Sequence, residues 1–467
     1  MSSYAKNSFA ATHRAFLDAD GLPFRDVLSE KQIQQLCDEE GVHFGCGEDE
    51  VYSPAVTLWA WLSQSLSASK SCVGAVARVL VLRVALQLPP CSAGTGAYCK
   101  ARAKLPERFL QRLTLHVGSE VERQVHDSWR WHNRRVLLAD GAECSMPDTP
   151  ENQQAYPQSG TQKKGLGFPL IRLVVLLCFA SACLVGCALG PRQGKETGET
   201  ALFRQLLEQI LSGDVVVADR YHCTWWQMAL VQQRGADAAF RLHARRHTDF
   251  RKGKRLGRGD HLVDWPKPPR PAWMDEQTYQ SLPDTLSIRE VRVRVSRPGY
   301  RVRAIVVCTT LKDAVQYPKE AIAELYDNRW HVELDIRAIK QTLKMDILSC
   351  KTPEMVRKEI WMHLLAYNLT RKVMAQAAAL GQRKPRQLSF AGAVQTLNAF
   401  RWLLVLSAEE RQAELGRILC LALRTHEVGN RPGRWEPRKV KRRPKPHARL
   451  MRPRAEERER MSKGRKG

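Results

Sequence analysis

Residues 326–340 read YDNRWHVELDIRAIK, and they guide the interpretation of the whole chain. At about 100° per residue in a helix, Tyr326, Arg329, Glu333 and Lys340 fall within an arc of about 60°. The apolar side chains form a separate stripe made of Leu325, Val332, Ile336, Ile339 and Leu343. A helix over about 319–345 is therefore predicted. It packs through its apolar stripe and presents a carboxylate, two cations and a phenol on the neighbouring face.

Two interpretations of this polar face are open from the residues alone. A carboxylate held between cations suits a site that binds both a metal ion and a phosphate. Ordinary surface pairing is the alternative, because Arg329–Glu333 and Glu333–Arg337 both have i,i+4 spacing.

Two short apolar segments each lead into an aspartate, LLAD at 137–140 and VVAD at 216–219. In a layered α/β sheet, side chains at the carboxyl ends of strands converge. Two carboxylates at one point suit a hard divalent cation. Asp140 and Asp219 are therefore candidate metal ligands, and the alternative is that each merely caps the next element.

Strand and helix patterns alternate through the middle of the chain. Strands are expected at 136–139 and 215–218, with two more joined by a tight turn across 169–189. Helices are expected at about 200–211, 319–345 and 353–380, with further helical pattern to about 425. This alternation favours an α/β layered core. The first ~130 residues have helical periodicity.

A basic helix is predicted from Thr95, with Lys100, Arg102 and Lys104 before Pro106. Such a helix could enter a DNA groove, or it could be a solvated face. A hairpin is predicted around Pro298–Gly299. Its apolar face alternates with a face of four arginines: Arg292, Arg294, Arg301 and Arg303. That face could follow phosphates, or it could simply be solvated.

The charge balance indicates a polyanionic partner. The 467 residues include 74 Lys+Arg and 48 Asp+Glu, giving a net charge of +26. Residues 431–467 alone hold 16 Lys+Arg against 4 Asp+Glu. Such an excess favours nucleic acid first and an anionic membrane surface second.

The 13 cysteines are scattered without a CxxC pair, which argues against zinc ribbons and a secreted disulfide scaffold. The N-terminus lacks the apolar core of a signal peptide. The apolar stretch Leu173–Leu189 has 17 residues, fewer than the ~20 that span a bilayer. A reduced cytosolic protein without a membrane segment is expected.

The spacing of Tyr326, Arg329, Glu333 and Lys340 resembles the signature of bacterial insertion-sequence DDE transposases of the IS-four family. Further similar segments are Trp330, KQTLKMD after the signature and HLLAYNLTR at 363–371. Asp140 and Asp219 stand where that family places its first two acids, each ending an apolar strand. The 114 positions from Asp219 to Glu333 leave room for the family's strand-rich insertion.

The resemblance implies an α/β fold: a ribonuclease-H-like core with a β-rich insertion, flanked by helical N- and C-terminal regions. The regions expected are a helical N-terminal DNA-binding region (1–130), the first part of the catalytic core (131–244), the β-rich insertion (245–318), the second part of the core (319–385), a C-terminal helical region (386–430) and a basic disordered tail (431–467).

The resemblance also implies the chemistry of a DNA transposase. Asp140, Asp219 and Glu333 would hold two Mg²⁺ ions, with Mn²⁺ able to substitute. Tyr326, Arg329 and Lys340 would grip the terminal phosphate of the transposon end. The insertion's arginines, Arg292 and Arg294 among them, would lie along DNA.

The expected reaction is metal-dependent cleavage at transposon ends, followed by transfer of the 3′-OH strand into target DNA. The expected partners are double-stranded DNA, both inverted-repeat ends and target, and a second copy of the chain on DNA. The expected compartment is the bacterial cytoplasm, in association with the nucleoid.

Two other functions are open at this point. One is a nuclease that uses the same core without strand transfer. The other is an inactive or domesticated transposase that binds DNA without catalysis. The presence of every acid and every signature residue argues against inactivation.

Overall fold

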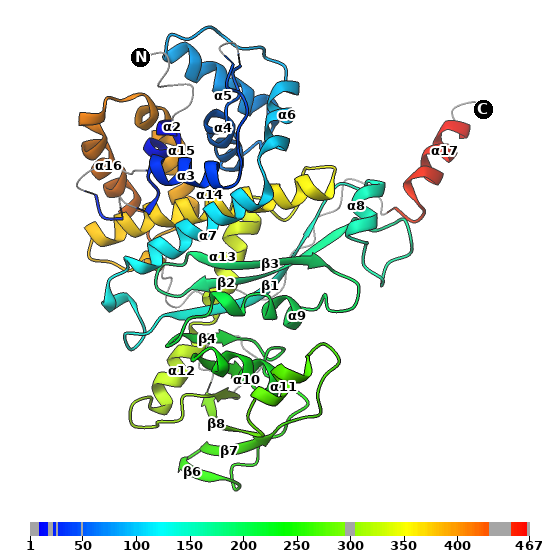
Figure 1. The fold of residues 1–467 in the computed structure, drawn as a ribbon, viewed down its shortest axis with the longest axis vertical. Coiled ribbons are helices and arrows are strands. Elements are labelled where there is room, and N and C mark those ends of the chain that lie inside the picture. Colours follow the sequence, from blue (N-terminus) through cyan, green and yellow to red (C-terminus); the bar gives the residue numbers. More distant parts are fainter. Residues whose placement is uncertain are drawn as a thin grey trace.

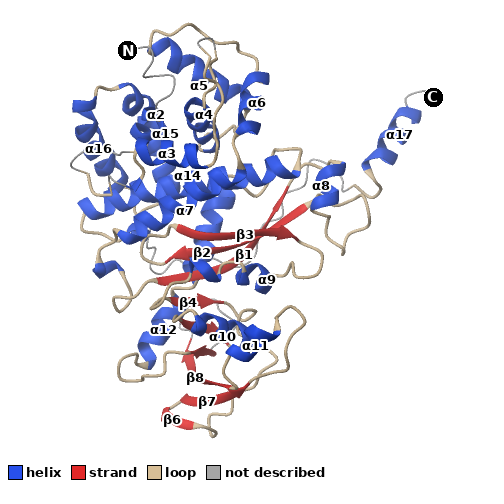
Figure 2. Ribbon diagram, in the orientation of Figure 1, coloured by secondary structure: helices blue, strands red, loops and turns tan. Residues whose placement is uncertain are grey.

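The computed structural model describes residues 9–16, 22–24, 27–47, 50–294, 304–428 and 450–464. A nine-stranded sheet in the order β3-β2-β1-β4-β5-β9-β8-β7-β6 runs through the lower half of the molecule in Figure 1. Helices from both ends of the chain gather above it, as the sequence colouring of Figure 1 shows, and Figure 2 sets these helices in blue against the red strands. The strands are β1 (Val136–Ser145), β2 (Leu170–Cys178), β3 (Leu184–Pro191), β4 (Val215–Ala218), β5 (Asp237–Arg241), β6 (Lys254–Gly257), β7 (Asp260–Pro266), β8 (Thr285–Arg294) and β9 (Ala304–Thr309).

The first five strands form the core that positions the candidate site. β1, β2 and β3 are an antiparallel meander, and β4 and β5 follow parallel to β1 on its other side. The meander arises from the uncharged run after Arg172, which supplies two buried strands separated by a tight turn at 179–183. This order and direction confirm the predicted ribonuclease-H-like core.

The strands within 245–318 extend the same sheet. β9 pairs antiparallel with β5, and β8, β7 and β6 follow outward in turn. The predicted hairpin is confirmed in its flanks, where Arg294 pairs with Ala304. Its turn at Pro298–Gly299 lies outside the described residues, as do Arg301 and Arg303.

Helices cover both faces of the core sheet. α9 (Glu199–Arg204) and α10 (Trp225–Gln233) pack on one face, against side chains such as Leu137 and Val216. On the other face lie α7 (Glu107–Arg123), α13 (Trp330–Arg337) and α14 (Pro353–Leu380), against Leu138 and Val217. Successive strand residues point to opposite faces, so the face toward α13 also receives residues 140 and 219.

The N-terminal helices pack together above α14 (Figure 1). Serine N-caps begin three of them: Ser29 accepts from the backbone N–H of Gln32, Ser53 from that of Val56 and Ser71 from that of Gly74. The described helices here are α2 (Ala10–Ala15), α3 (Glu30–Glu39), α4 (Pro54–Ser65), α5 (Cys72–Ala85) and α6 (Gly96–Lys104).

The predicted basic helix is α6, but its basic residues do not form one solvated face. Arg102 is buried, with its guanidinium carbon 4.8 Å from the centre of the Trp61 ring and 5.2 Å from that of Tyr98. Lys100 and Lys104 are exposed. Burial of the central arginine leaves this helix a weak candidate for entering a DNA groove.

The C-terminal helical pattern continues to 424. The remaining helices are α8 (Pro150–Ala155), α11 (Glu276–Ser281), α12 (Lys319–Asp327), α15 (Phe390–Leu406), α16 (Glu409–Arg424) and α17 (Arg454–Gly464). The expectation of a disordered tail is wrong over α17, which projects away from the body in Figure 1. Acidic residues in its first turn and the Lys463–Glu459 pair favour the helix locally. Within the described ranges, no helix combines the length and apolar character needed to cross a membrane.

Candidate active site

The pairing of β1 with β4 brings the two aspartates side by side. Val136 pairs with Val215 and Leu138 with Val217, an offset of 79 residues. Asp140 and Asp219 are separated by the same 79 residues. Each lies two residues after the pair Leu138–Val217, and because side chains alternate along a strand, both lie on the same face as that pair. Both side chains are partly exposed.

The prediction that Asp140 ends its strand is wrong. β1 continues to Ser145, because β2 pairs with it along its whole length and Asp140 lies opposite Val175. Only the parallel partner stops, since β4 ends at Ala218 and Asp219 follows directly. The apolar run ends at Asp140 because the candidate site begins there. The strand itself continues.

Glu333 lies on the side of Asp140 because its helix, α13, packs across β1. The predicted single helix over 319–345 is broken at two places. Arg329 donates its backbone N–H to Tyr326 and Val332 donates to Arg329, so a tighter i,i+3 turn separates α12 from α13. Residues 338–342 then form a π-helical turn. Such turns are frequent at functional sites, and this one shifts the helix phase before Lys340.

Arg329 links two of the three acids. Its Nη2 donates to Oε1 of Glu333 at 2.7 Å, and its Nη1 lies 3.7 Å from Oδ2 of Asp140. The guanidinium is mostly buried, with 18% of the side chain exposed. The i,i+4 pair with Glu333 is therefore present, but it is part of an inward-facing cluster and not a surface pair.

Tyr326 and Lys340 flank this cluster. Tyr326 is buried beneath Arg329, and burial raises the pKa of its phenol well above the ordinary value. Lys340 donates from Nζ to the backbone oxygen of Glu143 at 2.8 Å. Glu143 lies on β1 three residues after Asp140, so Lys340 and Arg329 both contact the same stretch of β1.

The electrostatics of the cluster are those of crowded carboxylates. Burial raises the pKa of Asp140 to about 6, and the charges of Asp219 and Glu333 act in the same direction. The N–H of Gly141, which donates to Oδ1 of Asp140 at 2.8 Å, and the charge of Arg329 oppose the shift. A cation among these acids would favour their ionised forms.

The donor set fits a hard divalent metal in kind, since it offers carboxylate oxygens from two adjacent strands and a facing helix. In the part of the chain that the structure describes, no three His, Cys, Asp or Glu side chains are grouped so as to hold a metal ion. The Arg329 guanidinium instead bridges Asp140 and Glu333. A metal ion held by these acids would compete with that bridge.

Arg292 and Arg294 do not join this cluster. Both are exposed on β8, and β8 is separated from β1 by β4, β5 and β9. The Arg292 guanidinium carbon lies 4.5 Å from the centre of the Phe250 ring. Their place is on the insertion, as expected, away from the acids.

A buried ion-pair network supports α13 and was not found by sequence reasoning. Asp335 accepts from Arg371 at 2.6 Å through Oδ1 and from Arg386 at 2.7 Å through Oδ2. Arg386 also donates to the backbone oxygens of Cys178 and Phe179 at the end of β2. The network fastens α13, and with it Glu333, to α14 and the sheet. Its only sequence signal is that Arg371 closes the HLLAYNLTR segment.

Two further acids near the site were also missed. Glu199 packs so closely on Gly141 that a Cβ there would lie 2.6 Å from its carboxyl carbon. Burial raises the pKa of Glu199. Glu143 accepts from Arg172 at 3.0 Å and from Arg192 at 2.9 Å. Neither acid ends an apolar run, so no pattern marked them.

Residues 131–369 match the family model described as a transposase DDE domain. The chain is 29% identical over 342 residues to the transposase InsG for insertion sequence element IS4 of Escherichia coli (strain K12), covering 70% of this chain and 75% of that protein. It is 27% identical over 153 residues to the putative transposase InsZ of the same strain, covering 32% and 49%.

A solved structure, the cryo-EM structure of piggyBac transposase synaptic complex with hairpin DNA, superimposes with a TM-score of 0.42 and 8% identity, covering 92% of this chain and 87% of that one.

The matched range takes in more than half of the 467 residues, including Asp140, Asp219 and the Tyr326–Lys340 signature. Enzymes of this family act on DNA and depend on divalent metal ions. The chain belongs to the DDE transposases.

Proposed function

We propose that this chain is a cut-and-paste transposase whose reacting phosphate binds between Asp140, Asp219 and Glu333. The observation that carries the proposal is the shared offset of 79 residues, which places Asp219 beside Asp140 on the face that α13 covers. Hydrolysis at the transposon end would free a 3′-OH. That hydroxyl would then attack a phosphodiester of target DNA.

The three acids would hold two Mg²⁺ ions, and Mn²⁺ would substitute. When bound, such ions stabilise both the attacking and the leaving oxygen of an in-line displacement at phosphorus. The acids supply oxygen ligands on a partly exposed surface. Arg329 pairs with two of these acids in this structure. If its guanidinium paired with a DNA phosphate instead, both carboxylates would be free to bind metal.

The remaining signature residues would hold the terminal phosphate. Arg329 and Lys340 bring positive charge to the end of β1, and the protonated Tyr326 hydroxyl can donate a hydrogen bond. Arg292 and Arg294 would follow the DNA backbone along the insertion. We further propose that the helical region 1–130 contributes to DNA binding and that two copies act together on paired ends, in the bacterial cytoplasm at the nucleoid.

The decisive experiment combines cleavage, joining and binding on one substrate. Purified protein is incubated with a labelled duplex of the DNA that flanks its reading frame, a supercoiled target and MgCl₂. Glu333→Gln and Asp140→Asn should each reduce cleavage by at least about 10²–10³-fold, as expected on losing a group that stabilises developing charge. Duplex binding by gel shift should remain.

Glu324→Gln is the matched control, because Glu324 is an exposed glutamate on α12 nine residues before Glu333. Cleavage without joining by the unaltered protein would identify a nuclease. Binding without either reaction would identify a non-catalytic DNA-binding protein. Metal-independent cleavage that survives both acid substitutions would refute the assignment of the site.

A further inference from the structure

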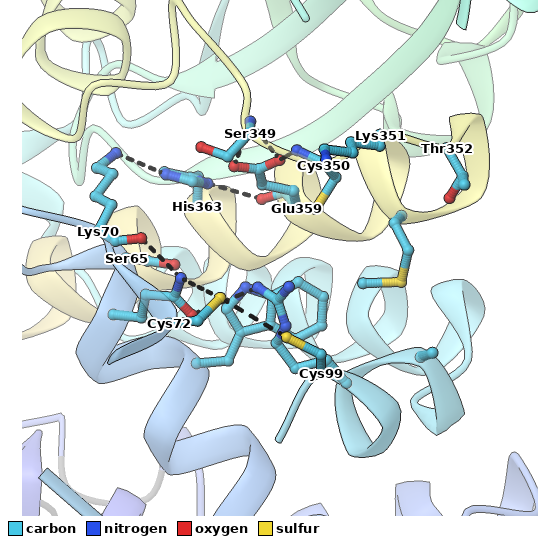
Figure 3. A pocket seen from close by; sticks show the side chains of 15 residues that line it. Ser65, Lys70, Cys72, Cys99, Ser349, Cys350, Lys351, Thr352, Glu359 and His363 are labelled. Carbon is cyan, nitrogen blue, oxygen red and sulfur yellow. Dashed lines mark hydrogen bonds between the residues drawn. The ribbon is translucent and has the colours of Figure 1, made fainter. Parts of the chain in front are cut away.

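Two cysteine side chains touch in the wall of a cavity of about 420 Å³ between the N-terminal helices and the start of α14 (Figure 3). Cys72 is the first residue of α5, and Cys99 lies on α6. A dashed line in Figure 3 marks the contact between their sulfur atoms, which are 3.9 Å apart although 27 residues separate the two cysteines in the sequence. The folding of the N-terminal region therefore brings two distant thiols into contact.

The contact is a short step from the geometry of a disulfide bond. Bonded sulfur atoms lie about 2.05 Å apart, so these two must approach by about 2 Å. The helices α5 and α6 already pack against each other. Each cysteine side chain rotates about its own Cα–Cβ bond, so the approach is shared between two side chains. Forming the bond therefore brings the two helices no further apart.

A small reagent can reach both thiols. All 13 cysteines are free, and most of them are buried. Cys46 is exposed, whereas Cys72, Cys91 and Cys99 are half-buried. Cys72 and Cys99 also line the cavity, which has ample room for a molecule of the size of water or hydrogen peroxide. Among the accessible thiols, the pair in sulfur contact is therefore open to an oxidant.

The hydrogen bonds around the pair give its two sulfur atoms different roles. Gln64 accepts from the Tyr98 hydroxyl through Oε1 at 2.6 Å, which leaves its Nε2 to donate to the sulfur of Cys72 at 3.7 Å. The Cys99 thiol donates to the same sulfur. Burial raises the pKa of Cys99, the neighbouring Cys72 acts in the same direction, and the charge of Arg102 opposes them. Cys99 thus keeps its proton and Cys72 is the attacking sulfur.

We propose that Cys72 and Cys99 form a reversible disulfide with hydrogen peroxide as the oxidant, and that this bond fastens α5 to α6. The sulfur of Cys72 attacks one peroxide oxygen, the O–O bond breaks, and the departing hydroxide leaves as water with the thiol proton. The sulfur of Cys99 then attacks the sulfenic acid on Cys72, the S–O bond breaks, and a second water leaves with the Cys99 proton. Two thiols and one peroxide give one disulfide and two waters.

The bond changes the stability of the N-terminal region. It closes a loop between residues that are 27 positions apart, and a crosslink of this kind restricts the unfolded chain more than the folded one. The melting temperature of the oxidised protein should therefore exceed that of the reduced protein by about 2–5 °C. A dithiol reductant such as dithiothreitol restores the two thiols and removes the difference.

The test is oxidation of the full, reduced chain by hydrogen peroxide in EDTA and without DNA, followed by alkylation of the denatured protein and peptide mass spectrometry. A linked peptide that joins Cys72 to Cys99 is expected, and dithiothreitol should remove it. Cys99→Ser should lose this product and accumulate a sulfenic acid on Cys72 that dimedone traps. Cys72→Ser should also lose the product, with trapping at Cys99 at least about tenfold weaker. Cys91→Ser, at another half-buried cysteine, is the control and should keep the product.

Three results would overturn the proposal. One is the survival of both thiols under conditions that oxidise the exposed Cys46. Another is a linked peptide that joins Cys72 or Cys99 to Cys350, which lines the same cavity, or to Cys91. The third is a disulfide that leaves the melting temperature unchanged. None of the three acids of the candidate active site lines the cavity, and the reaction contains neither metal nor DNA, so its result is independent of the proposed transposase reaction.

Discussion

The guanidinium of Arg329 lies against the carboxylate of Asp140, with Nη1 3.7 Å from Oδ2. Its other nitrogen donates to Glu333, so one positive charge occupies the space that two of the acids face. In the DNA-free chain the charge of this arginine acts together with the N–H of Gly141 to favour the ionised form of Asp140, against the charges of Asp219 and Glu333. Metal binding and DNA binding are therefore expected to be coupled through it.

Arg329→Gln should increase the affinity of the DNA-free chain for Mn²⁺ by a few-fold, because it removes a competing charge on the order of 1 kcal/mol. The measurement is a titration of free Mn²⁺ by electron paramagnetic resonance. Arg357→Gln, which removes a partner of Glu107 instead, should leave the affinity unchanged. Unaltered Mn²⁺ binding by Arg329→Gln would show that the bridge does not compete with metal.

Asp335→Asn should destabilise the fold by about 3–5 kcal/mol, since it leaves Arg371 and Arg386 as buried charges without their counter-ion. Urea unfolding followed by circular dichroism measures the change. Asp284→Asn is the comparison, because Asp284 is 99% exposed and lies 3.7 Å from Lys267; such surface pairs contribute about 0–1 kcal/mol. Equal losses for the two variants would contradict the role of the network.

Gly118→Ala should destabilise the contact between α7 and β3. A Cβ at residue 118 would lie 2.0 Å from the backbone oxygen of Leu184, which cannot move without breaking the strand. A cost of about 1–3 kcal/mol is expected from overpacking. Gly96→Ala, where no atom lies within 4 Å, should be neutral or slightly stabilising. The melting temperatures of the two variants test this prediction: Gly118→Ala should melt below the unaltered protein and Gly96→Ala should not. Equal melting temperatures would contradict it.

Stability should fall as the pH drops below about 6.5, with a contribution from His363. Burial lowers the pKa of this imidazole to about 3, and the charge of Lys70 acts in the same direction. Between about pH 6.5 and pH 3, His363 binds a proton in the unfolded chain but not in the folded chain, so protonation favours unfolding. His363→Gln should therefore narrow the difference between urea midpoints at pH 7 and pH 5. His247→Gln, at an exposed histidine, is the matched control, and an equal narrowing there would contradict the assignment.

The sequence was a good guide wherever one periodicity extended over a whole element. The helix expected at 353–380 is α14, Pro353–Leu380, and the two strands expected across 169–189 are β2 and β3. The sequence was a poor guide where packing against other parts of the chain decides whether a helix continues. The helix over 319–345 was expected to be continuous, yet it is interrupted after Asp327 and again at Ala338. No local propensity marks those breaks.

The candidate site divides in the same way. Residue types and spacing offered the three acids and the Tyr–Arg–Glu–Lys set as candidates, because carboxylates that follow apolar runs and a polar helix face are local patterns. The bridge from Arg329 to Asp140, the support of α13 by Asp335 and the cavity beside α14 were not foreseeable. Each joins residues that are distant in the chain.

The sequence by itself determined most of the strands and helices and offered the candidate side chains, since both follow from local periodicity and composition. Only the tertiary structure decided where those side chains meet. The parallel register of β1 with β4 sets Asp219 beside Asp140, and the packing of α13 on β1 brings Glu333 and Arg329 to them. Pairing and packing are long-range choices, made by the burial of one sheet face against helices from other parts of the chain.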